Sequence, residues 1–150
     1  MDTERSSKHK KSTVLIIEDD ADIRNFIARV LELEGYNVLT ASGGATGLEI
    51  IKEKTINLVL LDLLLPTLDG WSILREIKRN PELAIIPVVV LTAIAETLQR
   101  KKTLRMGAAG YLIKPLSASD LSRTVADILE QTASGQPIAW KEPALIKPAK

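Results

Sequence analysis

The sequence contains no cysteine and only one histidine, His9. The absence of cysteine excludes a thiol nucleophile, a disulfide framework and a cysteine-ligated metal, and it agrees with a reducing compartment. His9 lies in a polar leader, so Ser/His hydrolysis, histidine-ligated zinc and a helix-borne phosphotransfer histidine have little support. These classes of site are therefore set aside.

Aromatic residues and long apolar runs are also scarce. Aromatics make up 3% of the chain, too few for a base-stacking nucleic-acid platform. The formal net charge of +1 gives no broad basic field that attracts nucleic acid or a membrane surface. The N-terminus lacks an apolar signal core, and no apolar run approaches the roughly 20 residues that span a bilayer. We therefore expect a cytoplasmic protein without nucleic-acid or membrane partners.

An aliphatic, globular chain remains, and it fits one domain. Its 150 residues are 45% hydrophobic and 26% charged, which allows a packed core without disulfides or structural metal. Hydrophobic patterning predicts a polar tail at 1–12, the domain at 13–133, and a Pro- and Lys-containing tail or truncated linker at 134–150. The last segment is too short for a DNA-binding domain. We therefore expect the output to lie in a partner or in a part that was cut away.

Between residues 13 and 133, short apolar runs alternate with amphipathic stretches. Five runs predict strands: 14–17, 36–40, 58–61, 85–91 and 111–113. The stretches that follow them predict five helices, the last beginning at an N-cap on Ser119. This alternation is typical of an α/β fold in which helices cover both faces of a parallel sheet.

Polar side chains follow four of the five predicted strands. They are Glu18, Asp19 and Asp20 after the first, Asp62 after the third, Thr92 after the fourth and Lys114 after the fifth. Ligands of open parallel sheets bind outside the carboxyl ends of the strands, so one cleft is expected to hold this set. Each residue alone favours a structural role, as a helix cap, a strand threonine or a solvated turn lysine. Together they favour a functional site.

The charges of this cleft limit its chemistry. Two carboxylates about 4 Å apart repel by roughly 4 kcal/mol at an effective dielectric of about 20. Lys114 can neutralise only part of the repulsion, and the remainder requires either a raised carboxylate pKa or a bound cation, for which oxygen ligands favour Mg²⁺. Carboxylate, divalent ion, lysine and threonine are also the groups that stabilise a transferring phosphoryl group. The set therefore suggests an aspartyl-phosphate site.

Five short segments carry a resemblance to a known family. They are IEDD at 17–20, LDLLLP at 61–66, LDG at 68–70, LTA at 91–93 and YLIKP at 111–115. In this order, at these strand ends, the chain resembles the response regulator receiver domains of two-component signalling over roughly 13–133. The resemblance implies a flavodoxin-like doubly wound five-stranded sheet of order 2-1-3-4-5, as in a chemotaxis-regulator-like single receiver. It also implies a switch that catalyses only its own phosphorylation and dephosphorylation, and is otherwise no enzyme.

The resemblance assigns roles to the acids. Asp62 would accept phosphoryl from a histidine kinase or a histidine phosphotransfer protein. Asp19 would bind Mg²⁺ directly, Glu18 would act through water, and the Leu64 backbone carbonyl would complete the protein ligands. The spacing to an arginine in the first helix favours Glu18 and Asp19 as the acid pair, which leaves Asp20 to help start that helix.

The resemblance also implies a switch. Lys114, whose bond to Pro115 resembles the family's cis peptide, would pair with one phosphoryl oxygen, and Thr92 would hydrogen-bond another. Tyr111 would then turn inward. A downstream effector would read the surface formed by the helix at 96–106, the strand of Tyr111 and the final helix.

Some positions depart from the family pattern. Leu64 and Ile94 are apolar and can shield an acyl phosphate, so slow hydrolysis is expected. Ala109 and Gly110 stand where many transcription-factor receivers carry an acidic pair, which argues against the salt-bridged dimer of that class. We expect a monomer or a phosphorylation-dependent dimer. The basic stretch 99–105 fits a docking face for an acidic partner or a solvated helix equally well.

Two other functions compete with this prediction. A constitutive interaction module would keep the fold without using the site. An enzyme is the second alternative, but a dehalogenase-type phosphatase normally carries a second aspartate where Leu64 stands. The glycine-rich stretch 43–47 lacks the Gly-Lys-Ser/Thr ending of a nucleotide-binding loop, and a flavin would lack aromatic partners.

Overall fold

The computed structural model describes residues 12–66, 69–93 and 97–135. Most of both predicted tails and Ile94 lie outside the described residues. Among the residues described, every helix is too short or too polar to cross a lipid bilayer.

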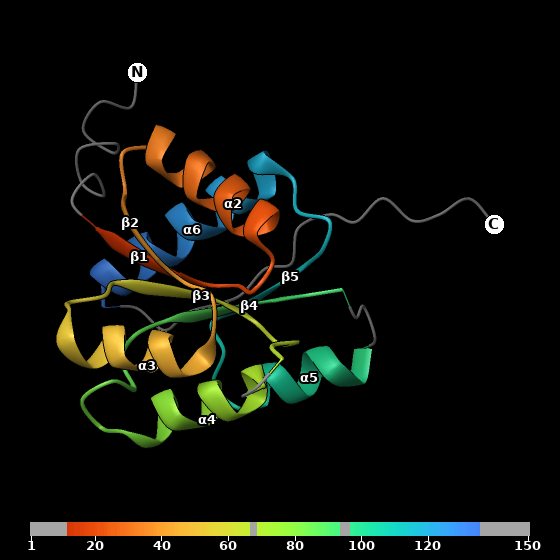
Figure 1. Ribbon diagram of the computed structural model, residues 1–150. Helices are drawn as coiled ribbons and strands as arrows, with labels where there is room; N and C mark the ends of the chain where they lie inside the picture. The colour runs from red at the N-terminus through yellow and green to blue at the C-terminus, as the bar shows by residue number, and fades with distance from the viewer. Residues whose placement is uncertain (1–11, 67–68, 94–96, 136–150) are drawn as a thin grey trace.

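Five parallel strands form one sheet in the order β2-β1-β3-β4-β5 (Figure 1). The strands are β1 (Thr13–Ile17), β2 (Asn37–Ala41), β3 (Leu58–Asp62), β4 (Val88–Thr92) and β5 (Gly110–Ile113). Every residue of β3 and β4 is buried, because these strands lie in the middle of the sheet and both of their faces are covered. The predicted flavodoxin-like fold and strand order are confirmed.

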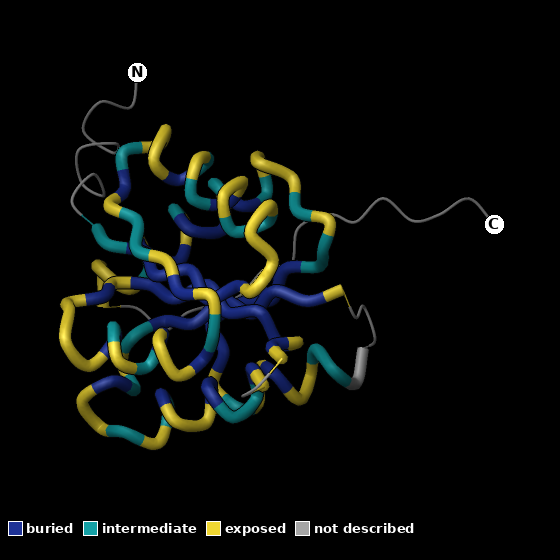
Figure 2. The backbone as a smooth tube through the Cα atoms, in the orientation of Figure 1, coloured by how far each residue is buried: buried dark blue, intermediate teal, exposed yellow. Residues whose placement is uncertain are grey.

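Helices cover both faces of the sheet (Figure 1). On one face lie α2 (Ala21–Leu33) and α6 (Ala118–Ala133), and on the other lie α3 (Gly44–Glu53), α4 (Gly70–Arg79) and α5 (Thr97–Arg105). Alternate strand residues point to opposite layers, so Val14 and Ile16 pack with the first group, and Leu15 and Ile17 with the second. Figure 2 shows the resulting buried layer between two shells of partly exposed helices.

Two predicted boundaries were wrong by two residues or more, and the other strand ends differ by at most one residue. The N-cap of α6 is Ser117, whose hydroxyl accepts the Asp120 N–H at 3.0 Å, and Ser119 lies inside the helix. The fourth strand begins at Val88, because residues 80–86 form turns in which the Asn80 carbonyl accepts two backbone N–H groups. Ile85 is therefore an exposed turn residue.

Candidate functional site

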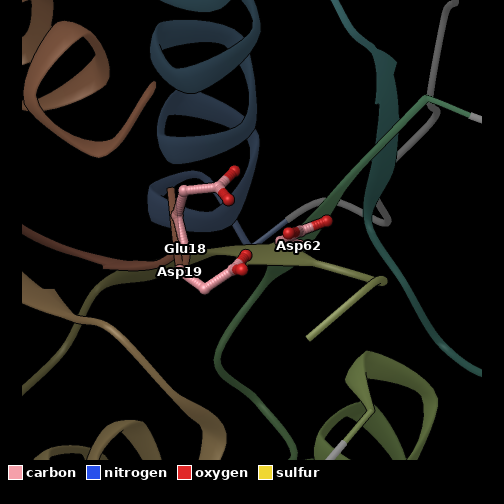
Figure 3. Close-up of side chains that lie close together, drawn as sticks. All are labelled: Glu18, Asp19 and Asp62. Atoms are coloured by element: carbon pink, nitrogen blue, oxygen red, sulfur yellow. The ribbon is translucent and has the colours of Figure 1, made fainter. Parts of the chain in front are cut away.

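Three carboxylates meet where β1 and β3 end. The register pairs Ile17 with Leu61, which places Glu18 directly beside Asp62. Glu18, Asp19 and Asp62 each offer one oxygen, and these oxygens lie within 4.8 Å of one another (Figure 3). Glu18 is 0% and Asp62 3% exposed, whereas Asp19 is exposed. The structure therefore brings together three of the acids expected at this edge.

Local hydrogen bonds fix the loop that carries the first two acids. Asp20 caps α2, because its Oδ1 accepts the N–H of Asp22 at 2.9 Å and of Ile23 at 3.1 Å. Arg24 of α2 donates from Nη1 to the backbone carbonyls of Glu18, at 2.9 Å, and Asp19, at 3.3 Å. As expected, Asp20 starts the helix and does not join the carboxylate cluster.

Lys114 lies between two of the carboxylates. Its Nζ is 2.6 Å from Glu18 Oε1 and 3.5 Å from Asp62 Oδ2. Burial raises the pKa of Glu18 from 4.5 to about 7, although Lys114 and the Asp20 N–H oppose the shift; the charge of Asp62 adds to it. Burial favours the neutral form of Lys114, but its bond to Glu18 and the two acidic charges raise its pKa above the ordinary value. One ammonium thus compensates the cluster only in part.

The donor set fits a divalent ion. Glu18 Oε1 is buried, and in the described part of the chain the group paired with it is the Lys114 ammonium, 2.6 Å away. Carboxylate oxygens are the ligands that Mg²⁺ prefers. Leu64 follows close by, and its N–H donates to Asp62 Oδ1 at 3.1 Å while its side chain is 55% exposed. The cluster could therefore hold a hard cation near the Asp62 carboxylate.

The hydroxyl expected at this edge is on the last residue of β4, and the expected aromatic lies in β5. Thr92 ends β4 and is fully buried, one residue beyond the position paired with Asp62. Tyr111 is 1% exposed. Its side chain is therefore already buried in the unmodified chain, whereas the resemblance implied that it turns inward only after modification of Asp62. The Lys114–Pro115 peptide is cis, as expected.

Sequence reasoning missed the importance of Gly70, which it used only as the last residue of the LDG segment at 68–70. A Cβ at this position would lie 2.4 Å from the carbonyl oxygen of Asp62 and 2.5 Å from Leu63 Cα. The Gly70 N–H donates to Leu63 O at 2.9 Å. The first turn of α4 is thus pressed against the backbone of Asp62. The Asp-Gly dipeptide was the available signal, but only the fold shows what the glycine approaches.

Comparison with known proteins agrees with this geometry. The model of the response regulator receiver domain family matches residues 14–126. The probable transcriptional regulator ycf27 of Porphyridium aerugineum is 34% identical over 122 residues, covering 81% of this chain and 50% of the relative. The phosphate regulon transcriptional regulatory protein PhoB of Pseudomonas aeruginosa is 35% identical over 123 residues, covering 82% and 54%. The chain therefore spans about half the length of these relatives.

Two solved receiver structures match this chain over nearly their whole length. A response regulator receiver domain protein from Clostridium thermocellum is 33% identical with a TM-score of 0.76, covering 83% of this chain and 99% of that one. A CheY-like receiver domain protein from Methanospirillum hungatei is 27% identical with a TM-score of 0.77, covering 83% and 98%.

Proposed function

This chain belongs to the response regulator receiver domain family, and on that premise we propose that Asp62 accepts a phosphoryl group from a histidine kinase or a histidine phosphotransfer protein. The observation that carries the proposal is the position of Asp62 at the end of β3, within 4.8 Å of two further carboxylates and 3.5 Å from Lys114. In this reaction the receiver would accept the phosphoryl group, and a partner protein would bind the modified receiver differently from the unmodified one.

The acids are proposed to share two tasks. Glu18, Asp19 and Asp62 would hold Mg²⁺ together with the Leu64 carbonyl, and the ion would neutralise charge on the transferring group. An oxygen of Asp62 attacks phosphorus, the bond from phosphorus to the donor's imidazole nitrogen breaks, and that nitrogen keeps the electron pair. Arg24 supports the step by holding the carbonyls of the acidic loop.

The basic and hydroxyl groups are proposed to bind the product. Lys114 already lies 2.6 Å from Glu18 and 3.5 Å from Asp62, so a small movement lets its ammonium pair with a phosphoryl oxygen. Thr92 would donate its hydroxyl to another oxygen and draw the start of the following segment inward. Tyr111, in β5, would couple this movement to the surface formed by α5, β5 and α6.

The proposed output is control of a downstream effector at this α5-β5-α6 surface. The two curated relatives are transcriptional regulators by name, and the chain spans about half of each. We propose a cytoplasmic receiver unit at 13–133 that acts as a monomer or a phosphorylation-dependent dimer, with no turnover beyond its own phosphorylation and dephosphorylation. The exposed side chain of Leu64 beside the acceptor supports slow hydrolysis of the product.

Incubation with Mg²⁺ and acetyl phosphate, followed by intact mass spectrometry, tests the proposal. Wild type is expected to gain one phosphoryl mass, Asp62→Asn none, and the control Asp22→Asn as much as wild type, since Asp22 is an exposed helix residue. Wild type that gains nothing, or Asp62→Asn that gains a full phosphoryl mass, would contradict it. Multiple turnover on phosphate esters would instead favour an enzyme.

A further inference from the structure

The described side chains of helix α5 bury little of their surface. Within its described side chains, at 99–105, only Thr103 is buried, and its hydroxyl donates to the Gln99 carbonyl inside the same helix at 2.8 Å. Lys101, Lys102 and Arg105 are exposed. A helix with few buried apolar contacts opens locally more easily than the rest of a domain. Each additional contact between α5 and the rest of the domain therefore contributes noticeably to the stability of the helix against local opening.

One such contact joins α5 to α4. The Nζ of Lys102 lies 4.2 Å from the centroid of the Trp71 ring, within the range of a cation–π interaction. Trp71 stands in the first turn of α4 and packs, partly buried, against the core under α3 and α4. The contact therefore ties an exposed helix to a side chain anchored in the core.

The anchored end of this contact adjoins the acceptor. Trp71 directly follows Gly70, whose Cα faces the backbone of Asp62 and Leu63 and whose N–H donates to Leu63 O at 2.9 Å. A shift in the first turn of α4 therefore presses on the end of β3. In addition, the N-terminus of α5 follows Thr92, the last residue of β4, after a short connection. The helix is thus linked to the site at two points.

We propose that Lys102 and Trp71 are positioning residues that hold α5 against α4 and thereby couple the place of α5 to the state of Asp62. The first part of the proposal, that the contact holds α5, depends only on the cation–π contact and not on the proposed function. Its second part rests on the proposed function: we take modification of Asp62 to move α5 away from α4, a movement that the contact opposes, so the contact favours the unmodified arrangement.

The holding of α5 is tested in the unmodified protein. In a Trp140→Phe background, which leaves Trp71 as the single tryptophan, we compare Lys102→Met with Lys102→Arg and Lys101→Met. Lys102→Met is expected to shift Trp71 emission and to speed amide hydrogen exchange in α5 about two- to fivefold, the size of an exposed cation–π contact. Lys101→Met removes the same charge without the contact and is expected to match wild type, as is Lys102→Arg. Equal exchange in the two methionine variants would overturn the proposal.

The coupling is tested with beryllofluoride and Mg²⁺, which together mimic an acyl phosphate. Because coupling between two equilibria is reciprocal, Lys102→Met is expected to bind beryllofluoride about two- to fivefold more tightly than Lys101→Met. In a Trp71→Leu background, which removes the aromatic ring, the same substitution is expected to have no further effect. Equal affinities of the two methionine variants would overturn the coupling. Wild type that binds no beryllofluoride would instead contradict the proposed function, and the exchange experiment would still decide whether the contact holds α5.

Discussion

Replacing Gly70 with alanine tests how closely the first turn of α4 controls the acceptor. The backbone torsion of Gly70 is not left-handed, so the requirement is space. The added Cβ would lie 2.4 Å from Asp62 O, whereas real Cβ contacts essentially never fall under 3.0 Å, so backbone on one side must move by about 0.6 Å. Such overpacking costs about 1–3 kcal/mol of the free energy of unfolding. It also displaces Asp62, whose Oδ2 is already 3.5 Å from Lys114.

The assay combines urea unfolding with the rate of phosphorylation by acetyl phosphate. Gly70→Ala is expected to phosphorylate about tenfold more slowly or worse, because misplacing a reacting group by 1 Å can cost about a hundredfold. The control is Gly43→Ala at the N-cap of α3, where an added Cβ meets nothing within 4 Å. It is expected to lose at most about 1 kcal/mol as a poorer cap and to keep the wild-type rate. A Gly70→Ala protein that matches this control in both measurements would refute the reasoning.

Two further predictions concern the acidic loop and the last helix. Because burial raises the pKa of Glu18 to about 7, Mg²⁺ must displace a proton below that pH. The affinity for Mg²⁺, measured by calorimetry, should fall by up to about tenfold per pH unit below 7 and level off above it. Glu18→Gln has no such proton and should flatten this pH profile. A wild-type affinity that is independent of pH between 5.5 and 8 would contradict the prediction. Ser117→Ala should lower the free energy of unfolding in urea by about 1 kcal/mol, because the Asp120 N–H loses its acceptor. The control Ser119→Ala should stay within about 0.5 kcal/mol of wild type. Equal losses in the two variants would show that Ser117 is not the cap.

The sequence predicted the fold because its signals were unambiguous in the middle of the sheet. Residues 58–61 and 88–91 are continuous apolar runs, and both proved to be fully buried strands. Boundaries were harder. Ser117 and Ser119 are equally good cap residues by type, and the choice between them depends on the path by which the chain leaves β5. Residues 85 and 86 look strand-like, but they belong to the turns that precede Pro87.

The acids of the site were predictable from their positions after strands, but their energetics were not. Sequence alone left open whether a raised carboxylate pKa or a cation relieves the repulsion. The raised pKa falls on Glu18 because that side chain, unlike Asp19, is removed from water. Likewise, no local pattern joins Lys102 to Trp71, because their contact depends on how α4 and α5 pack.

The sheet register explains why a lysine, and not a shorter side chain, follows β5. Asp62 pairs with Leu91, and Thr92 pairs with Ile113, so Lys114 begins two residue steps beyond the level of Asp62. β4 lies between β5 and β3, so two strand spacings, about 10 Å, also separate the two positions, and only a long side chain covers most of that distance. Its ammonium therefore returns to the cluster, 2.6 Å from Glu18 and 3.5 Å from Asp62. A slip of one residue between β4 and β5 would turn the β5 side chains to the opposite layer and bury the ammonium away from the acids. The apolar residues of these strands, which resist that slip, thus determine where the charge of the site lies.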